Sequence, residues 1–191
     1  MNGNSKITLF GTALFDGDTI VGNLTGDKTR FLLMVRDEFE RGFFTMQDPN
    51  RADLAIPIDV SSLKSPKINV TFIDQKPVIQ VKIFLNGEIL AVQSRVYYEY
   101  PQMKTILEKR FSKSLEKGIQ DLADKCINLN VDAMKLGSHA VKKFLTIDER
   151  EEYEWNKNFS DTKVEVDVEF YIRRTGTQIY SNEINDSSGD N

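Results

Sequence analysis

The candidates for chemistry in this 191-residue chain are a glycine-containing segment, one cysteine and one histidine. The segment Gly22–Thr29 reads G-N-L-T-G-D-K-T and invites comparison with a phosphate-binding loop. Such a loop needs about four residues between its glycines and a lysine directly after the second, so that backbone N–H groups and the lysine meet the phosphate. Here three residues separate the glycines, and Asp27 puts a carboxylate where the anion would lie. The segment therefore does not predict nucleotide binding.

Cys126 and His139 are the one pair that could supply nucleophilic catalysis. Cys126 falls on the apolar stripe of a predicted helix, and His139 falls in the polar, basic stretch Ser138–Lys143. We interpret the cysteine as a buried, inert thiol and the histidine as a solvated or locally hydrogen-bonded side chain. A hydrolase that uses His139 is the least favoured of three functional hypotheses.

Carboxylates gather at Asp148–Glu154 and at Glu165, Asp167 and Glu169. Such groups can bind calcium or act in acid–base catalysis. The first group has the composition of a helix N-terminus, and the second alternates as the solvent face of a strand does. We therefore assign no catalytic, metal-binding or cofactor-binding residue, and we predict that the protein is not an enzyme.

Aromatic residues are the remaining candidates for a functional surface. They gather at Tyr97, Tyr98 and Tyr100, ahead of a long predicted helix, and at Tyr153 and Trp155, ahead of the last predicted strand. Aromatic rings of this kind suit either the edge of a core or a docking patch. Both interpretations stay open, and these five residues are the candidate interface.

A helix predicted over Pro101–Asn128 must position these groups. Apolar residues recur there with helical spacing for about seven turns, at Met103, Leu107, Phe111, Leu115, Ile119, Leu122 and Cys126. Charged and polar residues fill most of the opposite face. At about 1.5 Å per residue the helix is roughly 40 Å long, so we expect it to lie along an extended sheet.

Alternating apolar residues predict the strands of that sheet. A turn at Asp16-Gly17 predicts a first hairpin over Ile7–Leu24. Thr25 or Asp27 can cap a helix over 28–39 that ends near Gly42. Further strands are predicted at 43–46, 54–60, 68–72, 79–85, 89–96, 134–136 and 164–172.

Three local signals refine this pattern. Pro57 lacks an N–H and predicts that the strand 54–60 is an edge strand. Asn86-Gly87 predicts a hairpin turn, which makes 68–96 a three-stranded meander. A capping box at Thr146–Glu149 predicts a short helix up to Lys157.

The predicted fold is a single α+β domain over residues 1–176. It is mainly antiparallel β-sheet, made of hairpins and a meander, packed against one long amphipathic helix plus two shorter helices. Residues 177–191 are predicted to form a polar C-terminal tail.

Composition limits the classes of function. A net charge of −4 and a pI near 5.2 argue against binding of nucleic acid. No apolar run reaches the roughly 20 residues that a membrane span needs, and Met1–Lys6 does not read as a secretion signal. We expect this chain itself to be soluble.

Several segments then point to a known family by their order and spacing: Gly11–Phe15, Asp18–Leu24, Thr29–Leu33, Asn130–Gly137, Trp155–Phe159, Val164–Val168 and Arg173–Gly176. Together they resemble the C-terminal domain of the C subunit of bacterial spore nutrient germinant receptors, the Ger(x)C lipoprotein family. Asn130–Gly137 is similar to that family's Val-Asp-x-x-x-x-Gly block, and Trp155–Phe159 is similar to its Trp-x-x-x-Phe block. The resemblance covers roughly residues 11 to 176.

The resemblance implies a non-enzymatic scaffold or interaction domain that is needed for nutrient-triggered spore germination. It implies a germinant receptor A subunit and a permease-like B subunit as partners, at the outer face of the spore inner membrane. A lipid anchor would belong to the full-length protein only. The alternative is a domain of the same receptor that directly binds a small ligand, an amino acid or a sugar, in a pocket lined by Tyr97, Tyr98, Tyr100 or Trp155. The resemblance carries over no ligand-binding residue.

Overall fold

The computed structural model describes residues 11–94, 96–144 and 153–175. Its strands form two sheets, a separate hairpin of order β1-β2 and a four-stranded sheet of order β3-β4-β5-β6. In chain order the elements are β1 (Gly11–Asp16), β2 (Thr19–Thr25), α1 (Gly26–Val35), β3 (Arg41–Gln47), β4 (Ala55–Ile73), β5 (Lys76–Ile89), α2 (Pro101–Asn128), α3 (Gly137–Ala140), η1 (Val141–Lys143), α5 (Trp155–Asn158), η2 (Phe159–Asp161) and β6 (Lys163–Thr175).

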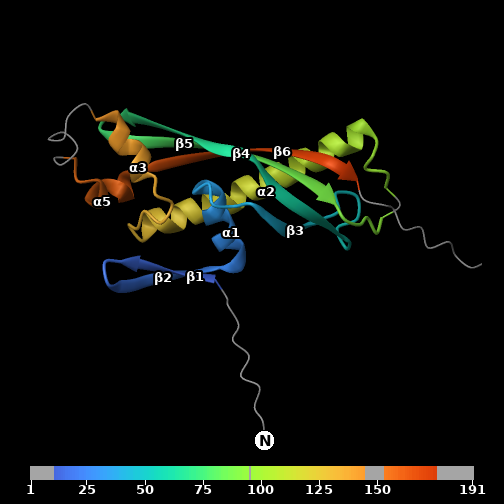
Figure 1. The fold of residues 1–191 in the computed structure, drawn as a ribbon, viewed down its shortest axis with the longest axis horizontal. Helices are drawn as coiled ribbons and strands as arrows, with labels where there is room; N and C mark the ends of the chain where they lie inside the picture. The colour runs from blue at the N-terminus through green and yellow to red at the C-terminus, as the bar shows by residue number, and fades with distance from the viewer. Residues whose placement is uncertain (1–10, 95, 145–152, 176–191) are drawn as a thin grey trace, which may run out of the picture.

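The long helix α2 runs along the four-stranded sheet, as Figure 1 shows. It has the predicted bounds, with Pro101 in its first turn, where a missing N–H costs nothing. The side chains that it buries follow the predicted stripe: Leu107, Phe111, Leu115, Ile119, Leu122, Ala123 and Cys126. The long amphipathic helix is therefore confirmed.

The sheet contains one pair of parallel strands that the sequence did not predict. β6 pairs with β5 in parallel, whereas β3-β4, β4-β5 and the β1-β2 hairpin are antiparallel. Parallel neighbours need a crossover connection, and here α2 and the short helices after it provide it. The chain is thus an α+β domain with a mainly antiparallel sheet, as predicted, plus one β-helix-β unit.

The hairpin predicted at Asn86-Gly87 is wrong. β5 continues through both residues to Ile89, and Asn86 pairs with Ser61 of β4 on one side and Tyr171 of β6 on the other. The Ser61 hydroxyl donates to Asn86 Oδ1 at 3.1 Å, so the buried amide is satisfied inside the sheet. The third strand of the meander, 89–96, is wrong as well, because the chain leaves the sheet after Ile89.

The strands predicted at 54–60 and 68–72 are one long strand, β4, with an irregular register around Ser62–Lys67. β4 lies between β3 and β5, so the prediction of an edge strand from Pro57 is wrong. The N–H of Leu90 donates to Pro57 O at 3.0 Å. Because N–H and C=O of one strand residue point to the same side, the missing N–H of Pro57 would face the place where β5 has just ended.

The first helix has one of the two predicted N-caps, but it begins at Gly26, two residues before the predicted start, and it ends early. Thr25 is the N-cap of α1, and its side chain accepts from the N–H of Lys28. α1 stops at Val35, and Asp37 takes a left-handed φ of 60°. The predicted stop residue, Gly42, lies instead in β3.

The remaining predictions have different outcomes. The strand predicted at 134–136 is wrong, because these residues form a turn between α2 and α3. The capping box at Thr146–Glu149, the start of the first hairpin at 7–10 and the tail 177–191 lie outside the described residues.

Phe111 of α2 contacts both edge strands of the four-stranded sheet. Its ring lies 6.2 Å from Phe44 of β3 and 4.6 Å from Phe170 of β6, both in edge-to-face geometry. Phe111 is 2% exposed. The ring therefore ties the helix to both edge strands of the sheet.

Replacing Phe111 by alanine should lower the free energy of unfolding by about 3–5 kcal/mol, because the cavity cannot be refilled by two edge strands fixed in a sheet. Urea unfolding followed by circular dichroism measures this. Phe43, which is 65% exposed on β3, is the matched control, and Phe43→Ala should change stability by less than about 0.5 kcal/mol. Equal losses in both variants would show that Phe111 does not have this role.

Candidate functional site

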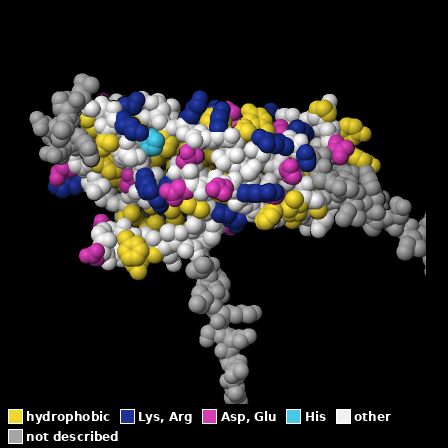
Figure 2. All heavy atoms as spheres, viewed as in Figure 1, with side chains coloured by type: hydrophobic (Ala, Val, Ile, Leu, Met, Phe, Trp, Pro, Cys, Tyr) yellow, Lys and Arg dark blue, Asp and Glu magenta, His cyan; other side chains and the backbone are white. Residues whose placement is uncertain are grey.

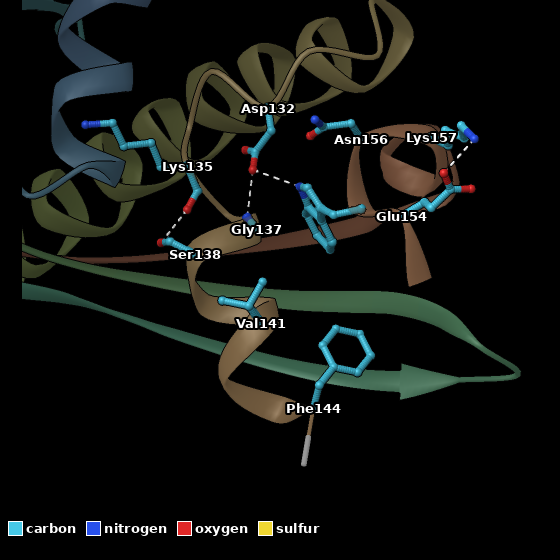
Figure 3. A pocket seen from close by; sticks show the side chains of 10 residues that line it. Asp132, Lys135, Gly137, Ser138, Val141, Phe144, Glu154, Asn156 and Lys157 are labelled. Carbon is cyan, nitrogen blue, oxygen red and sulfur yellow. Dashed lines mark hydrogen bonds and ion pairs between the residues drawn. The ribbon is translucent and has the colours of Figure 1, made fainter. Parts of the chain in front are cut away.

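The carboxylate of Asp132 joins segments that are distant in the sequence. Its Oδ1 accepts from the backbone N–H of Leu136 at 2.8 Å, and its Oδ2 accepts from the N–H of Gly137 at 2.6 Å. Oδ2 also accepts from Trp155 Nε1 at 3.0 Å (Figure 3). One charged acceptor thus holds the turn after α2 and fastens the indole of α5 to it.

Asn130 makes a second set of contacts between the same segments. It has a φ of 51°, a conformation that asparagine tolerates directly after a helix. Its Nδ2 donates to Asn156 O at 2.9 Å, and its Oδ1 accepts from the N–H of Ser160 at 3.0 Å. The end of α2 is therefore tied to both α5 and η2, just before β6 begins.

Gly137 allows the indole to lie directly on the backbone. A Cβ at this position would lie 2.5 Å from Trp155 Nε1, closer than any side chain permits. Asn130, Asp132, Gly137 and Trp155 are called the Asp132 hub below. The hub brings together the two family-like blocks noted in the sequence.

An open cleft of about 850 Å³ lies beside the hub. Its lining includes the apolar side chains of Trp155, Val141 and Phe144 and the charged residues Lys135, Glu154 and Lys157. In Figure 3 the ammonium end of Lys135 points away from Val141 and Phe144. Lys157 Nζ lies 2.6 Å from Glu154 Oε1, and Lys135 Nζ lies 3.3 Å from Glu38 Oε1. The cleft could take a small polar molecule with an apolar part.

Tyr153 and Trp155 belong to a chain of aromatic contacts. Rings of Phe72, Phe144 and Tyr153 lie 5.3–5.4 Å apart, and Trp155 lies 6.3 Å from Tyr153 and 5.7 Å from Phe159. Phe159 is fully buried, whereas Tyr153 and Trp155 are half-buried. These two candidates therefore form the edge of the core next to the cleft.

Tyr98 lies in the core at the opposite end of α2. It is fully buried, and its hydroxyl donates to Asp48 Oδ1 at 2.6 Å. Burial and the neighbouring Asp48 carboxylate raise the pKa of Tyr98 to about 12. Burial also raises the pKa of Asp48, but hydrogen bonds from Ser94, Tyr98 and backbone N–H groups outweigh it and leave that pKa below its usual value. Tyr98 thus anchors the segment before α2 to the loop after β3.

Tyr97 and Tyr100 are the exposed members of the five, at 46% and 60%. Their ring centroids lie 5.9 Å apart, so they form one aromatic pair next to the start of α2. The Asp132 hub follows the other end of this 28-residue helix, and its length of about 40 Å separates the two. The five candidates therefore do not form one site.

The residues considered for catalysis are Cys126, His139 and the segment that holds Asp27. Cys126 is fully buried, and burial raises the pKa of its thiol to about 11, which leaves almost no thiolate at neutral pH. His139 lies in α3, where burial and then Lys142 lower its pKa. Asp27 of the segment Gly22–Thr29 pairs with Arg30 in α1.

The acidic residues of β6 have basic neighbours. Lys82 pairs with both Asp167 and Glu169, and Lys163 pairs with Glu165. Hydrogen bonds from Lys82 and Lys163 lower the pKa values of Glu169 and Glu165. Within residues 11–94, 96–144 and 153–175, no group of three His, Cys, Asp or Glu side chains is placed to hold a metal ion.

Sequence reasoning missed the Asp132 hub as a structure. Asn130–Gly137 and Trp155–Phe159 were noted as blocks, but no contact between them was predicted. The available signal was chemical, since one block holds a carboxylate and the other holds an indole N–H that needs an acceptor when buried.

Comparisons with known proteins agree with this architecture. A family model described as Spore germination B3/GerAC like, C-terminal, matches residues 10–176. Spore germination protein KC of Bacillus subtilis (strain 168) is 30% identical over 102 residues, which are 53% of this chain and 25% of that protein. The crystal structure of the GerBC protein matches with a TM-score of 0.72 and 23% identity, over 90% of this chain and 54% of that chain. This chain thus spans about a quarter of the curated relative and about half of the solved one.

This chain is an α+β domain in which the end of a long crossover helix is fastened to the segment that leads into the last strand. The solved GerBC protein has the same fold. This chain belongs to the family of Spore germination B3/GerAC-like C-terminal domains. The resemblance found in the sequence is confirmed.

Replacing Asp132 by alanine leaves three N–H donors without their acceptor, and we expect the free energy of unfolding to fall by about 2–3 kcal/mol. Trp155 is the single tryptophan, so its fluorescence reports both unfolding in urea and the environment of the hub. The native emission should shift to longer wavelength as the indole loses its contact.

Asp124→Ala is the matched control, because that carboxylate is exposed on α2 and accepts from Gln120 Nε2 within the helix. It should change stability by less than about 0.5 kcal/mol and leave the native emission unchanged. Indistinguishable behaviour of the two variants would rule out the hub as a fastening point.

Proposed function

We propose that this domain is a non-enzymatic scaffold and interaction domain of a spore germinant receptor C subunit, needed for nutrient-triggered germination. The observation that carries the proposal is the family match over residues 10–176. The partners would be the A subunit and the permease-like B subunit of the receptor. The full-length protein would be lipid-anchored at the outer face of the spore inner membrane. None of the described helices is long and apolar enough to cross a membrane.

The pair Tyr97 and Tyr100 is the surface that we assign to partner docking. Exposed tyrosines give large contact areas at low entropic cost and are enriched at protein interfaces. Leu90 and Ile106, on either side of the pair in the sequence, are also exposed, at 45% and 43%. Buried Tyr98 holds the same segment in place, so the pair stands on a fixed base.

The charge distribution supports a protein partner over a nucleic acid. On the face that Figure 2 shows, basic and acidic side chains are interspersed and form no continuous basic surface. The net charge of −4 points the same way.

Replacing Tyr97 and Tyr100 together by serine in the full-length protein should weaken receptor assembly. We expect at least tenfold less A and B subunit to co-purify with the variant, because two central aromatic contacts typically supply 2 kcal/mol or more. Spores that carry the variant should germinate more slowly with nutrient, while germination by a receptor-independent trigger stays normal.

Tyr171→Ser is the control, because Tyr171 is 49% exposed but lies on β6. Thermal unfolding of the isolated chain checks that Tyr97→Ser/Tyr100→Ser folds normally. Normal assembly and germination in that double variant would exclude this docking surface. Normal assembly and germination after deletion of the whole domain would exclude the proposed function.

The second candidate is direct binding of an amino acid or a sugar. The observation that favours it is the cleft beside Trp155, which combines an indole and apolar side chains with Lys135, Glu154 and Lys157. Tyr98 was also considered as a pocket residue, but it is buried and its hydroxyl already donates to Asp48.

Calorimetry and ligand-detected NMR with amino acids and sugars at millimolar concentration test this alternative. Binding in the cleft should change Trp155 fluorescence, and Lys157→Ala should reduce affinity several-fold by removing one polar contact. Tyr100→Ser lies at the far end of α2 and should leave affinity unchanged. Flat titrations with all ligands would exclude the candidate.

A further inference from the structure

β6 is an edge strand of the four-stranded sheet and runs for 13 residues. A long edge strand offers a row of backbone N–H and C=O groups that another strand can pair with. Val164, Val168, Phe170 and Ile172 on this strand are buried, so it is also apolar on one face. Such an edge needs protection if the protein is to avoid pairing with itself.

Two glutamates of α2 occupy this edge. Glu116 Oε1 accepts from the N–H of Val168 at 3.2 Å, and Glu108 Oε1 accepts from the N–H of Ile172 at 2.8 Å. Val168 and Ile172 are four residues apart, so their N–H groups point to the same side of β6. Because these N–H groups bond to α2, that side faces away from β5. The carboxylates therefore take the positions that carbonyl groups of an added strand would take.

The spacing of the two elements explains why both contacts form together. Glu108 and Glu116 are eight residues apart, which is about 12 Å along a helix. Val168 and Ile172 are four residues apart, which is about 13 Å along a strand. The helix and the strand run in opposite directions, so each glutamate meets its own amide.

A basic side chain covers a backbone group at the other edge of the sheet. Arg30 of α1 donates to the carbonyl of Phe43 on β3, the strand at that edge. Acidic side chains thus contact edge N–H groups, and a guanidinium contacts an edge carbonyl. The chemistry of each helix side chain matches the backbone group that it covers.

We propose that Glu108 and Glu116, by covering these edge amides, prevent β6 from pairing with β6 of a second copy of this chain. An antiparallel pair of two β6 strands centred on Phe170 would place Val168 of one copy opposite Ile172 of the other. The two amides that the glutamates cover are the ones that this pairing would use. The proposal concerns a sheet edge and does not depend on the proposed docking function of Tyr97 and Tyr100.

Amide hydrogen exchange tests the contacts one at a time. In dilute samples of the full chain, Glu116→Ala should speed exchange at Val168 by about tenfold or more and leave Ile172 nearly unchanged, because a hydrogen bond to a charged acceptor is lost at one site. Glu108→Ala should do the reverse. Glutamine at either position keeps an acceptor oxygen at the same reach and should retain most of the protection.

Sedimentation velocity over a concentration series tests the consequence. Glu108→Ala/Glu116→Ala should associate more strongly than the parent chain, and Glu108→Gln/Glu116→Gln should match the parent. Asp121→Ala/Asp124→Ala removes the same charge from exposed positions of α2 and should also match the parent. Circular dichroism confirms that each variant is folded; if the double alanine variant is not, the single variants are used.

Three results would overturn the proposal. One is unchanged exchange at Val168 and Ile172 in the alanine variants. Another is a folded alanine variant that associates no more than the parent at any concentration. The third is equal association of the alanine and glutamine variants, which would assign the effect to charge rather than to the acceptor oxygen.

Discussion

The structure depends on the contact between α2 and the four-stranded sheet. A parallel β5-β6 pair can form only if the chain returns across the sheet, and a helix of 28 residues is long enough to carry it from one end to the other. The apolar stripe of α2 buries the inner face of the sheet, and Phe111 links it to β3 and β6. The same helix meets the edge of β6 through Glu108 and Glu116. The position of α2 against the sheet therefore accounts for both the core packing and the protection of the β6 edge.

The Asp132 hub completes this return. After α2 ends, the chain must reverse direction and enter β6 in register with β5. Asp132 fixes the turn through backbone N–H groups, and Asn130 ties the helix end to Asn156 and Ser160, three to seven residues before β6. These contacts are side chain to backbone for the most part, so they specify chain direction more than they add buried area. The hub is an architectural feature that happens to border a cleft.

The sequence predicts those parts of the fold that are encoded locally. The stripe of α2, the cap at Thr25 and the turn at Asp16-Gly17 each depend on residues within a few positions, and each is present. Asn86-Gly87 is a strong local turn signal, yet partners 25 and 85 residues away keep it inside a strand. Alternation also says nothing about strand direction, so the parallel β5-β6 pair was out of reach. Tyr97 and Tyr98 are neighbours, but Tyr98 is buried, and its hydroxyl donates to Asp48, a residue 50 positions away in the sequence.

The hub also bears on what the family resemblance can say about function. The blocks Asn130–Gly137 and Trp155–Phe159 carry much of the resemblance, and the structure shows that their polar side chains bond to each other and to the backbone. Residues that are needed to build the crossover are required by the fold, whatever molecule the surface binds. A match at these residues therefore indicates the fold and does not identify a partner. Residues that decide a partner must therefore lie where the fold does not require their identity. We therefore propose Tyr97 and Tyr100 as partner-contacting residues, because both side chains are exposed, whereas buried Tyr98 anchors the segment.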